Sequence, residues 1–201
     1  GMVSNSGGKI SYVYSNDMNG DGQSFNDLIY VPQAASELNF ADITSGSGDN
    51  LVTLFTAEEQ VAAFDTYINN KDYLKERRGQ YAERNGGYFP WLNRFNFSLV
   101  QEVYFKVGVK QMKNTLQFRF DILNVGNMLN NKWGVGNVST STNPLTLASV
   151  NSDGEPVYKM ATQVVKNDDG TSQTILLRDS FVKSITIDNV WQAQFGIRYI
   201  F

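Results

Sequence analysis

The sequence predicts an all-β protein with a small helical insertion, built from antiparallel strands of a transmembrane β-barrel that are joined by long extracellular loops. Three observations predict this class. Residues 191–201 alternate apolar and polar side chains and end on Phe201. The segments 94–107 and 115–123 alternate in the same way. Helical patterning is confined to residues 57–78, inside a long polar stretch.

The last strand, expected over 190–201, carries the clearest pattern. A period of two places successive side chains on opposite faces of a strand. One face is apolar and aromatic: Trp191, Ala193, Phe195, Ile197, Tyr199 and Phe201. The other face holds Gln192, Gln194, Gly196 and Arg198, with Ile200 as its single large apolar side chain. An apolar-out, polar-in strand of about ten residues is what a transmembrane barrel requires.

Composition narrows the classes of function. The chain has 201 residues, 41% hydrophobic residues and a net charge of -3. No apolar run is long enough for a membrane helix, and there is no basic footprint for nucleic acid. The absence of Cys and His excludes thiol chemistry, the usual zinc sites and Ser-His-Asp triads. We therefore expect no catalytic residues, no organic cofactor and no enzyme activity.

The first half of the chain is expected to hold one strand and two helices. No signal peptide is visible, and Gly1 before Met2 indicates that residues 1–8 are a cloning scar or leader. Residues 9–14 alternate as a strand. Thr56 and Glu59 form a capping box that starts a helix over 57–69, and a second helix over 71–78 ends at Gly79. The first helix either covers a small core of its own loop or contacts a partner.

Two long strands follow, over 94–107 and 115–123, joined by a short turn. Phenylalanines and aliphatic residues share one face of each strand, while charged and amide side chains share the other. Gln101 interrupts the apolar face, which suggests a bulge. Residues 132–188 are polar and irregular, with short strands expected over 156–165 and 172–179 and a hairpin turn at 168–170.

The spacing of the four expected strands follows a topological rule. Outer-membrane barrels have short periplasmic turns and long external loops. The gap between 94–107 and 115–123 is short, whereas 15–93 and 124–189 are long and would be external. Four strands are too few to close a barrel, so the chain is expected to be the C-terminal piece of a larger protein. A soluble antiparallel sandwich, whose apolar faces meet each other, also fits the alternation.

One loop resembles the start of a calcium site. Asp17, Asn19 and Asp21 alternate before Gly22, and oxygen side chains at such spacing converge on a hard cation. Gln23 offers its backbone carbonyl, and Asp27 is a further acidic ligand. The acid expected at the twelfth position is missing, because Leu28 stands there. A polar turn without metal is the other interpretation.

Two more groups have alternative interpretations. Arg119 and Asp121 share a strand face with Gln117, either as part of a polar lumen that touches a passing solute or as an ion pair across neighbouring strands, with Glu102 and Arg198 as further members. Tyr88, Phe89 and Trp91 either form an aromatic girdle at a membrane interface, stack on a sugar, or pack beneath the helical loop.

Several segments resemble SusC-like TonB-dependent transporters. YAERNGG at 81–87 followed by PWLNRF at 90–95 resembles the approach to a late barrel strand. The segments NTLQ at 114–117 and DILNVGN at 121–127, then LN at 129–130 and WG at 133–134, resemble the next strand and its loop. YVY at 12–14, DMNGDG at 17–22 and DLIYVP at 27–32 are similar to the preceding strand. The terminal Phe201 resembles the signal of barrel assembly.

The resemblance implies an importer in the outer membrane of Bacteroidetes-type bacteria. Such transporters are driven by TonB, pair with a SusD-like surface lipoprotein, and take up oligosaccharides or peptides. The resemblance covers most of 8–135 and 190–201. The alternative function is a soluble β-rich module that binds glycans and is stabilised by calcium. A fragment of a barrel would also have unpaired strand edges, so self-association is expected.

Overall fold

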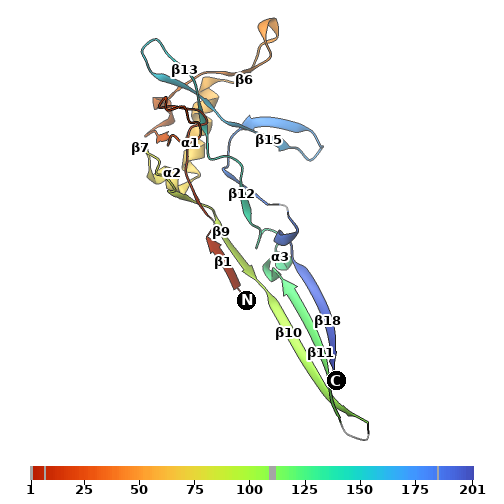
Figure 1. The fold of residues 1–201 in the computed structure, drawn as a ribbon. Helices are drawn as coiled ribbons and strands as arrows, with labels where there is room; N and C mark the ends of the chain where they lie inside the picture. Colours follow the sequence, from red (N-terminus) through yellow and green to blue (C-terminus); the bar gives the residue numbers. More distant parts are fainter. Residues whose placement is uncertain (1, 7, 109–111, 185) are drawn as a thin grey trace. The chain divides into compact units, whose positions relative to one another are not determined.

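The computed structural model describes residues 2–6, 8–108, 112–184 and 186–201. The chain is mostly β-strand with few helices, which confirms an all-β fold. The described strands form sheets of two or three strands, and none of these sheets closes on itself. Two compact units are present (Figure 1): unit 1 contains residues 1–7, 90–138 and 183–201, and unit 2 contains residues 8–89 and 139–182.

Unit 1 is built around a three-stranded sheet in the order β10-β11-β18. These strands are β10 (Phe97–Val107), β11 (Met112–Leu123) and β18 (Gln192–Ile200). A second pair joins β1 (Met2–Ser6) to β9 (Trp91–Phe95). The short helices α3 (Val125–Leu129) and η3 (Ile187–Asn189) lie in the segments that connect the strands (Figure 1).

The register of the large sheet is regular. β10 pairs antiparallel with β11 from Phe97 opposite Ile122 to Val107 opposite Met112, and no shift interrupts it. β11 pairs antiparallel with β18 from Thr115 opposite Ile200 to Leu123 opposite Gln192. The bulge expected at Gln101 is therefore wrong, since Gln101 lies directly opposite Phe118. The predicted turn over 108–114 is described only in part, because 109–111 lie outside the described residues.

Two predicted strands differ from the structure. The segment 94–107 is divided at Asn96, because β9 pairs with β1 whereas β10 pairs with β11. The segment 9–14 is not one strand: β2 covers Lys9–Ile10, and Val13 makes an isolated bridge to Leu28. Tyr12, Val13 and Tyr14 are consecutive and all buried in unit 2. A segment that buries both of its faces does not present one face to lipid, so the assignment of 9–14 as a membrane strand is wrong.

Unit 2 consists of short strands and two helices. The regions expected to be external loops, 15–93 and 124–189, thus contain regular structure. Four of its sheets have two strands each. β2 pairs with β8 (Gly87–Tyr88), and β3 (Tyr30–Val31) pairs with β7 (Gln80–Tyr81). β5 (Ile43–Ser45) pairs with β6 (Val52–Phe55), and β15 (Thr162–Lys166) pairs with β16 (Ser172–Leu176). A three-stranded sheet has the order β13-β14-β4, from Leu145–Val150, Pro156–Met160 and Asn39–Phe40.

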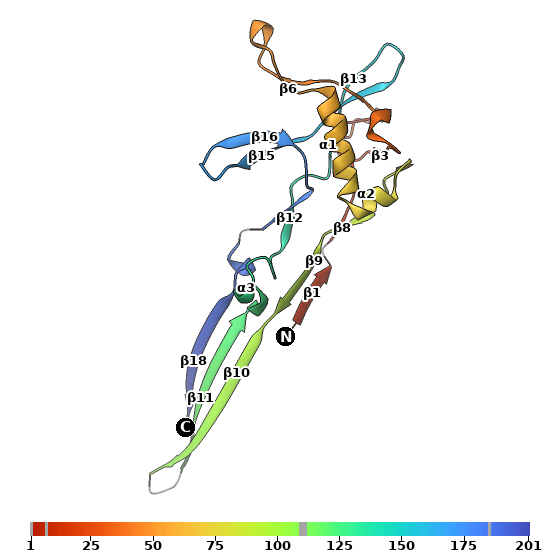
Figure 2. The same ribbon diagram turned by 180° about the vertical axis from the view of Figure 1, so that it is seen from behind.

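The described residues also contain short 3-10 helices and a further pair of short strands. The 3-10 helices η1 and η2 cover Ala35–Glu37 and Gly48–Asn50. β12 (Asn137–Ser139) pairs with β17 (Phe181–Lys183). The expected turn at 168–170 is confirmed, because it joins β15 to β16. The strand expected over 156–165 is divided into β14 and β15, and Figure 2 shows the β15–β16 hairpin clearly.

The two helices follow the sequence prediction closely. α1 spans Ala57–Asn69, with the Thr56 hydroxyl accepting from the Glu59 amide and the Glu59 carboxylate accepting from the Thr56 amide. α2 is shorter than expected, spanning Asp72–Glu76. Gly79 has a φ of 76°, a left-handed conformation that glycine adopts without steric penalty. None of the helices in the described part of the chain is long and apolar enough to span a membrane.

The apolar core of the described residues lies entirely in unit 2. α1 contributes Phe64, Tyr67 and Ile68, each with no exposed surface, so the interpretation that this helix covers its own core is confirmed. The polar segment 139–182 also contributes five core side chains, which the sequence pattern did not reveal: Leu145, Tyr158, Met160, Leu176 and Leu177. Stacked rings at Tyr14 and Tyr158 join the two sequence-distant halves of unit 2.

One buried amide connects three segments of unit 2. Gln60 in α1 has no exposed surface. Its Nε2 donates to the Ala41 carbonyl at 2.8 Å and to the Thr56 carbonyl at 3.2 Å, while its Oε1 accepts from the Met160 amide at 3.0 Å. Buried backbone groups need such partners. Gln60 therefore fixes the start of α1 against β14 and the residues that follow β4.

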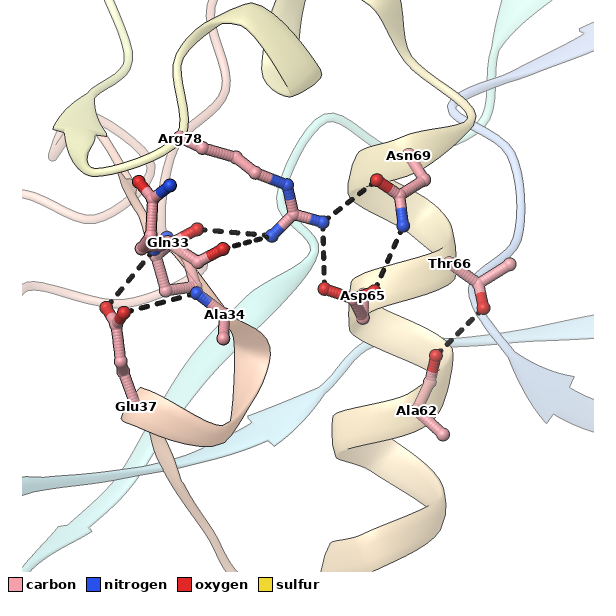
Figure 3. Close-up of polar contacts among 9 residues, drawn as sticks. Gln33, Ala34, Glu37, Ala62, Asp65, Thr66, Asn69 and Arg78 are labelled. Atoms are coloured by element: carbon pink, nitrogen blue, oxygen red, sulfur yellow. Dashed lines mark hydrogen bonds and ion pairs between the residues drawn. The ribbon is translucent and has the colours of Figure 1, made fainter.

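A guanidinium group connects α1 to the segment before η1. Figure 3 shows Arg78 reaching Asp65 and Asn69 on one side and the carbonyl of Gln33 on the other. The distances are 2.8 Å to Asp65 Oδ1, 3.0 Å to Asn69 Oδ1 and 2.8 Å to Gln33 O. Glu37 accepts from the Gln33 and Ala34 amides and so caps η1. The fork of donors on arginine is suited to this role.

We predict that Gln60→Leu lowers the free energy of unfolding of unit 2 by about 2–4 kcal/mol, because the Met160 amide and the Ala41 carbonyl lose their partner in a buried place. Hydrogen exchange of the α1 amides measures this change. Gln173→Leu, at an exposed position of β16, is the control and leaves exchange unchanged. Equal protection in both variants would contradict the role given to Gln60.

Candidate functional site: the two-faced sheet and the acidic loop

One face of the β10-β11-β18 sheet is apolar across all three strands. The register aligns Phe97 with Ile122 and Ala193, then Leu99 with Phe120 and Phe195, then Gln101 with Phe118 and Ile197, and then Val103 with Leu116 and Tyr199. The side chains of Leu99, Phe195 and Ile197 are 53%, 64% and 61% exposed. A large apolar patch of this kind marks an interaction surface or a membrane contact.

The other face of the sheet is polar and internally hydrogen bonded. Asp121 accepts from Arg119 Nε at 2.6 Å and from Ser98 Oγ at 2.5 Å. Glu102 accepts from Gln117 Nε2 at 2.7 Å and from the Tyr104 hydroxyl. The expectation of an ion pair across neighbouring strands is wrong for Arg119 and Asp121, because both residues belong to β11. In the register, Gln117 of β11 lies between Glu102 of β10 and Arg198 of β18.

Aromatic side chains gather at both ends of unit 1. At the end nearest the β10–β11 turn, the rings of Phe105 and Tyr199 are 6.3 Å apart, and those of Tyr199 and Phe201 are 6.0 Å apart. The Lys113 ammonium lies 4.1 Å from the centre of the Tyr104 ring. At the other end of the sheet, Trp133 and Trp191 lie near the end of β11 and the start of β18. Asn127 Nδ2 donates to the Trp133 carbonyl, and Asn127 Oδ1 accepts from the Trp191 amide.

The aromatic girdle expected from Tyr88, Phe89 and Trp91 is divided between the two units. Phe89 packs against Phe181, with ring centres 4.8 Å apart, at the edge of the unit 2 core. Tyr88 is exposed in β8 of unit 2. Trp91 belongs to β9 of unit 1 and is 71% exposed. Packing therefore explains Phe89, while Trp91 stays available for an interface.

Buried asparagines organise the end of the sheet that carries α3. The buried residues of unit 1, within the described part, are Asn114, Asn124, Asn127, Gly134 and Asn189. Asn124 Nδ2 donates to the carbonyls of Gly134 and Asn189. Asn189 Oδ1 accepts from the Gly136 amide at 2.8 Å and from Arg94, whose Nε also bonds to Gly134. The asparagine side chains replace the backbone partners that the irregular connections lack.

The acidic loop is closed by its own backbone. Asp17 accepts from the amides of Gly20 and Gly22, at 2.7 and 2.8 Å. Asp21 accepts from the Gln23 amide and from the side chains of Asn19 and Asn26. Hydrogen bonds from the Gln23 amide and then from Asn19 lower the pKa of Asp21. Asp27 accepts from the amide of Met18, the residue after Asp17, at 2.7 Å.

The loop brings together Asp17, Asn19 and Asp21, but these oxygens are engaged in turn hydrogen bonds. In the part of the chain that the structure describes, no group of three or more acidic, His or Cys side chains gathers as a metal-holding cluster. Gly22 has a φ of 84°, which fits the sharp bend at the sixth position of a calcium loop. Calcium binding stays a prediction.

Comparison of the chain with protein-family models, with curated proteins and with solved structures finds no match. The resemblance to SusC-like transporters therefore rests on the sequence segments themselves. The site residues that sequence reasoning missed are the buried asparagines at 124, 127 and 189. Their only sequence signal is the spacing of Asn124 and Asn127 directly after a strand, which also fits an ordinary polar turn.

We predict that Gly134→Ala destabilises unit 1 by about 1–3 kcal/mol. Gly134 has a φ of 65°, and a methyl group there would overlap the Asn124 amide. Gly126→Ala is the matched control, because its methyl group would meet Trp133 only at 3.7 Å. Tryptophan fluorescence during urea unfolding reports on unit 1. If the two variants unfold at the same urea concentration, the asparagine cluster has no structural role.

We predict that millimolar calcium raises the thermal midpoint of the chain and that Asp17→Asn removes this rise. Saturation at one hundred times the dissociation constant would stabilise the folded state by about 2.7 kcal/mol. Asp168→Asn, in the β15–β16 turn, is the control and keeps the response. Isothermal titration without heat, together with an unchanged thermal midpoint, would leave the loop as a polar turn.

Proposed function

We propose that this chain supplies barrel strands and external loops of a TonB-dependent outer-membrane importer, with no catalytic role. The observation that carries the proposal is the inverted polarity of unit 1. Its described buried residues are asparagines and a glycine, whereas most of its phenylalanines and aliphatic side chains are exposed and the others, such as Phe118 and Leu116, are only partly buried. Leaving one large apolar side chain in water costs about 1.5–3 kcal/mol. Hydrocarbon on one face of the sheet removes this cost.

The dimensions of the sheet support a membrane environment. β10 has 11 residues and β18 has 9, and a tilted strand that crosses the hydrocarbon layer needs about 9–11 residues. Aromatic side chains flank the apolar band at both ends, as the girdles of outer-membrane barrels do. The polar face, with its Arg119–Asp121 pair and the Glu102–Gln117 contact, suits an aqueous lumen.

The order of turns and connections supports the same assignment. A short turn joins β10 to β11, whereas the connection from β11 to β18 contains 68 residues between Leu123 and Gln192. Outer-membrane barrels have short periplasmic turns and long extracellular loops. If the short connection is on the periplasmic side, the residues between β10 and β11 are periplasmic and the residues of unit 2 belong to external loops. Strand edges at β10 and β18 would pair with further strands.

The class of transporter is inferred from the sequence segments that resemble SusC-like proteins. In this proposal the solute is an oligosaccharide or a peptide, TonB supplies the driving force, and a SusD-like lipoprotein is the surface partner. The chain is located in the outer membrane.

A second function, a soluble β-rich module that binds glycans, is favoured by a specific observation in unit 2. This unit has its own apolar core and a loop with calcium-type spacing. If unit 2 accounts for the function, the chain is a monodisperse monomer in buffer without detergent. The exposed apolar face of unit 1 favours the importer instead.

We predict that Phe195→Lys greatly reduces binding of the full chain to phospholipid vesicles, because a lysine facing the middle of the bilayer costs about 2–4 kcal/mol. Co-flotation with vesicles of phosphatidylcholine measures the bound fraction. Gln194→Lys is the matched control: it adds the same charge on the neighbouring residue, opposite Asp121 on the polar face. Equal binding by the two variants, or a wild-type chain that is monomeric in buffer and ignores vesicles, would overturn the proposal.

A further inference from the structure

Unit 1 contains an apolar cavity of about 520 Å³ that the proposed transport function does not use. It lies where α3 and the following turn approach β9, and each of its lining residues belongs to unit 1. Its walls include two of the three tryptophans of the chain. The main side chains around it are Trp91, Leu92, Phe95, Leu129, Lys132 and Trp133.

The walls of this cavity are apolar and accessible. Leu129 is 72% exposed and Trp133 is 57% exposed, so the apolar side chains are not covered by other parts of the described chain. Gly126 lies beside Trp133, since a methyl group at Gly126 would be in ordinary van der Waals contact with it. Phe95 lies two residues before Phe97, where the apolar face of the large sheet begins. The cavity therefore extends the surface proposed to face lipid.

Two positive charges accompany this apolar surface. Lys132 lines the cavity, and the Lys183 ammonium donates to the Lys132 carbonyl at 3.2 Å. None of the residues that line the cavity is acidic. Lysines beside tryptophans at the end of an apolar band are suited to a negatively charged head group whose chains enter the hydrocarbon layer.

We propose that this cavity binds an anionic phospholipid or a related phosphate-bearing membrane lipid. The acyl chain lies against Trp91, Leu129 and Trp133, and the phosphate group pairs with Lys132 and Lys183. The inference rests on the proposal that unit 1 faces lipid, and adds a lipid head-group preference to it. A carbohydrate fits less well, because Asn93 and Lys132 are the polar and charged residues among those lining the cavity, apart from the indole N–H groups.

The test uses the full chain in dodecylphosphocholine micelles that contain a phospholipid with brominated acyl chains. Bromine quenches tryptophan fluorescence at short range, and two of the three tryptophans line the cavity. Brominated phosphatidic acid is compared with brominated phosphatidylcholine at the same mole fraction. We expect phosphatidic acid to quench at a lower mole fraction, by about fivefold for each lysine that contacts the phosphate.

Two double variants separate this site from general attraction to charge. Lys132→Gln with Lys183→Gln removes the preference for phosphatidic acid. The control, Lys106→Gln with Lys113→Gln, changes two lysines that pair with each other at the other end of the sheet, and keeps it. Because Lys183 also bonds to the backbone, Lys132→Gln alone serves as a second test and lowers the preference about fivefold.

The outcomes distinguish this inference from the proposed function. Equal quenching by the two lipids in a chain that still binds vesicles would overturn the lipid site and leave the membrane proposal intact. A preference for phosphatidic acid in a chain that does not bind vesicles would overturn the barrel assignment and support the site. A fluorescence response to inorganic phosphate alone, or to maltoheptaose in place of lipid, would also overturn the site.

Discussion

The uninterrupted antiparallel register of β10, β11 and β18 is the constraint on which unit 1 depends. Side chains alternate between the faces of a sheet, so a slip of one residue would move every apolar side chain to the opposite face. The register from Phe97–Ile122 to Val103–Leu116 keeps the phenylalanines and aliphatic residues together, with Gln101 as the exception. The same register places Asp121, Arg119, Glu102 and Gln117 together on the other face.

The two units differ in how far their apolar side chains are removed from water. Unit 2 removes it from water by packing short strands around α1, with Phe64, Tyr67 and Ile68 at the centre. Unit 1 leaves it exposed, and asparagines occupy its buried positions. Apolar side chains on the face of a sheet are stabilised where their surroundings exclude water. This physical requirement, and not the family resemblance, is the strongest support for a membrane setting.

In both units, amide side chains form hydrogen bonds with the backbone of the irregular connections. Gln60 supplies partners for the backbone at Ala41 and Met160 in unit 2. Asn189 does the same in unit 1, where it accepts from the Gly136 amide and donates to the Ser184 carbonyl, while Asn124 donates to the carbonyls of Gly134 and Asn189. An amide carries both a donor and an acceptor, so one side chain satisfies backbone groups of both kinds. One of these ordered connections, together with β9, forms the lysine-flanked cavity beside α3.

The sequence by itself determined the elements whose patterns are local: α1 with its capping box, the alternation of β10, β11 and β18, and the turn between β15 and β16. Local periodicity and turn chemistry carry those features. Only the tertiary structure decided that Tyr12, Val13 and Tyr14 are buried on both faces of their segment, that 94–107 is divided at Asn96, and that 139–182 contributes to a core. Short strands of two to six residues leave no periodic signal, and their burial depends on partners distant in the chain. The asparagine cluster and the cavity depend on such partners in the same way.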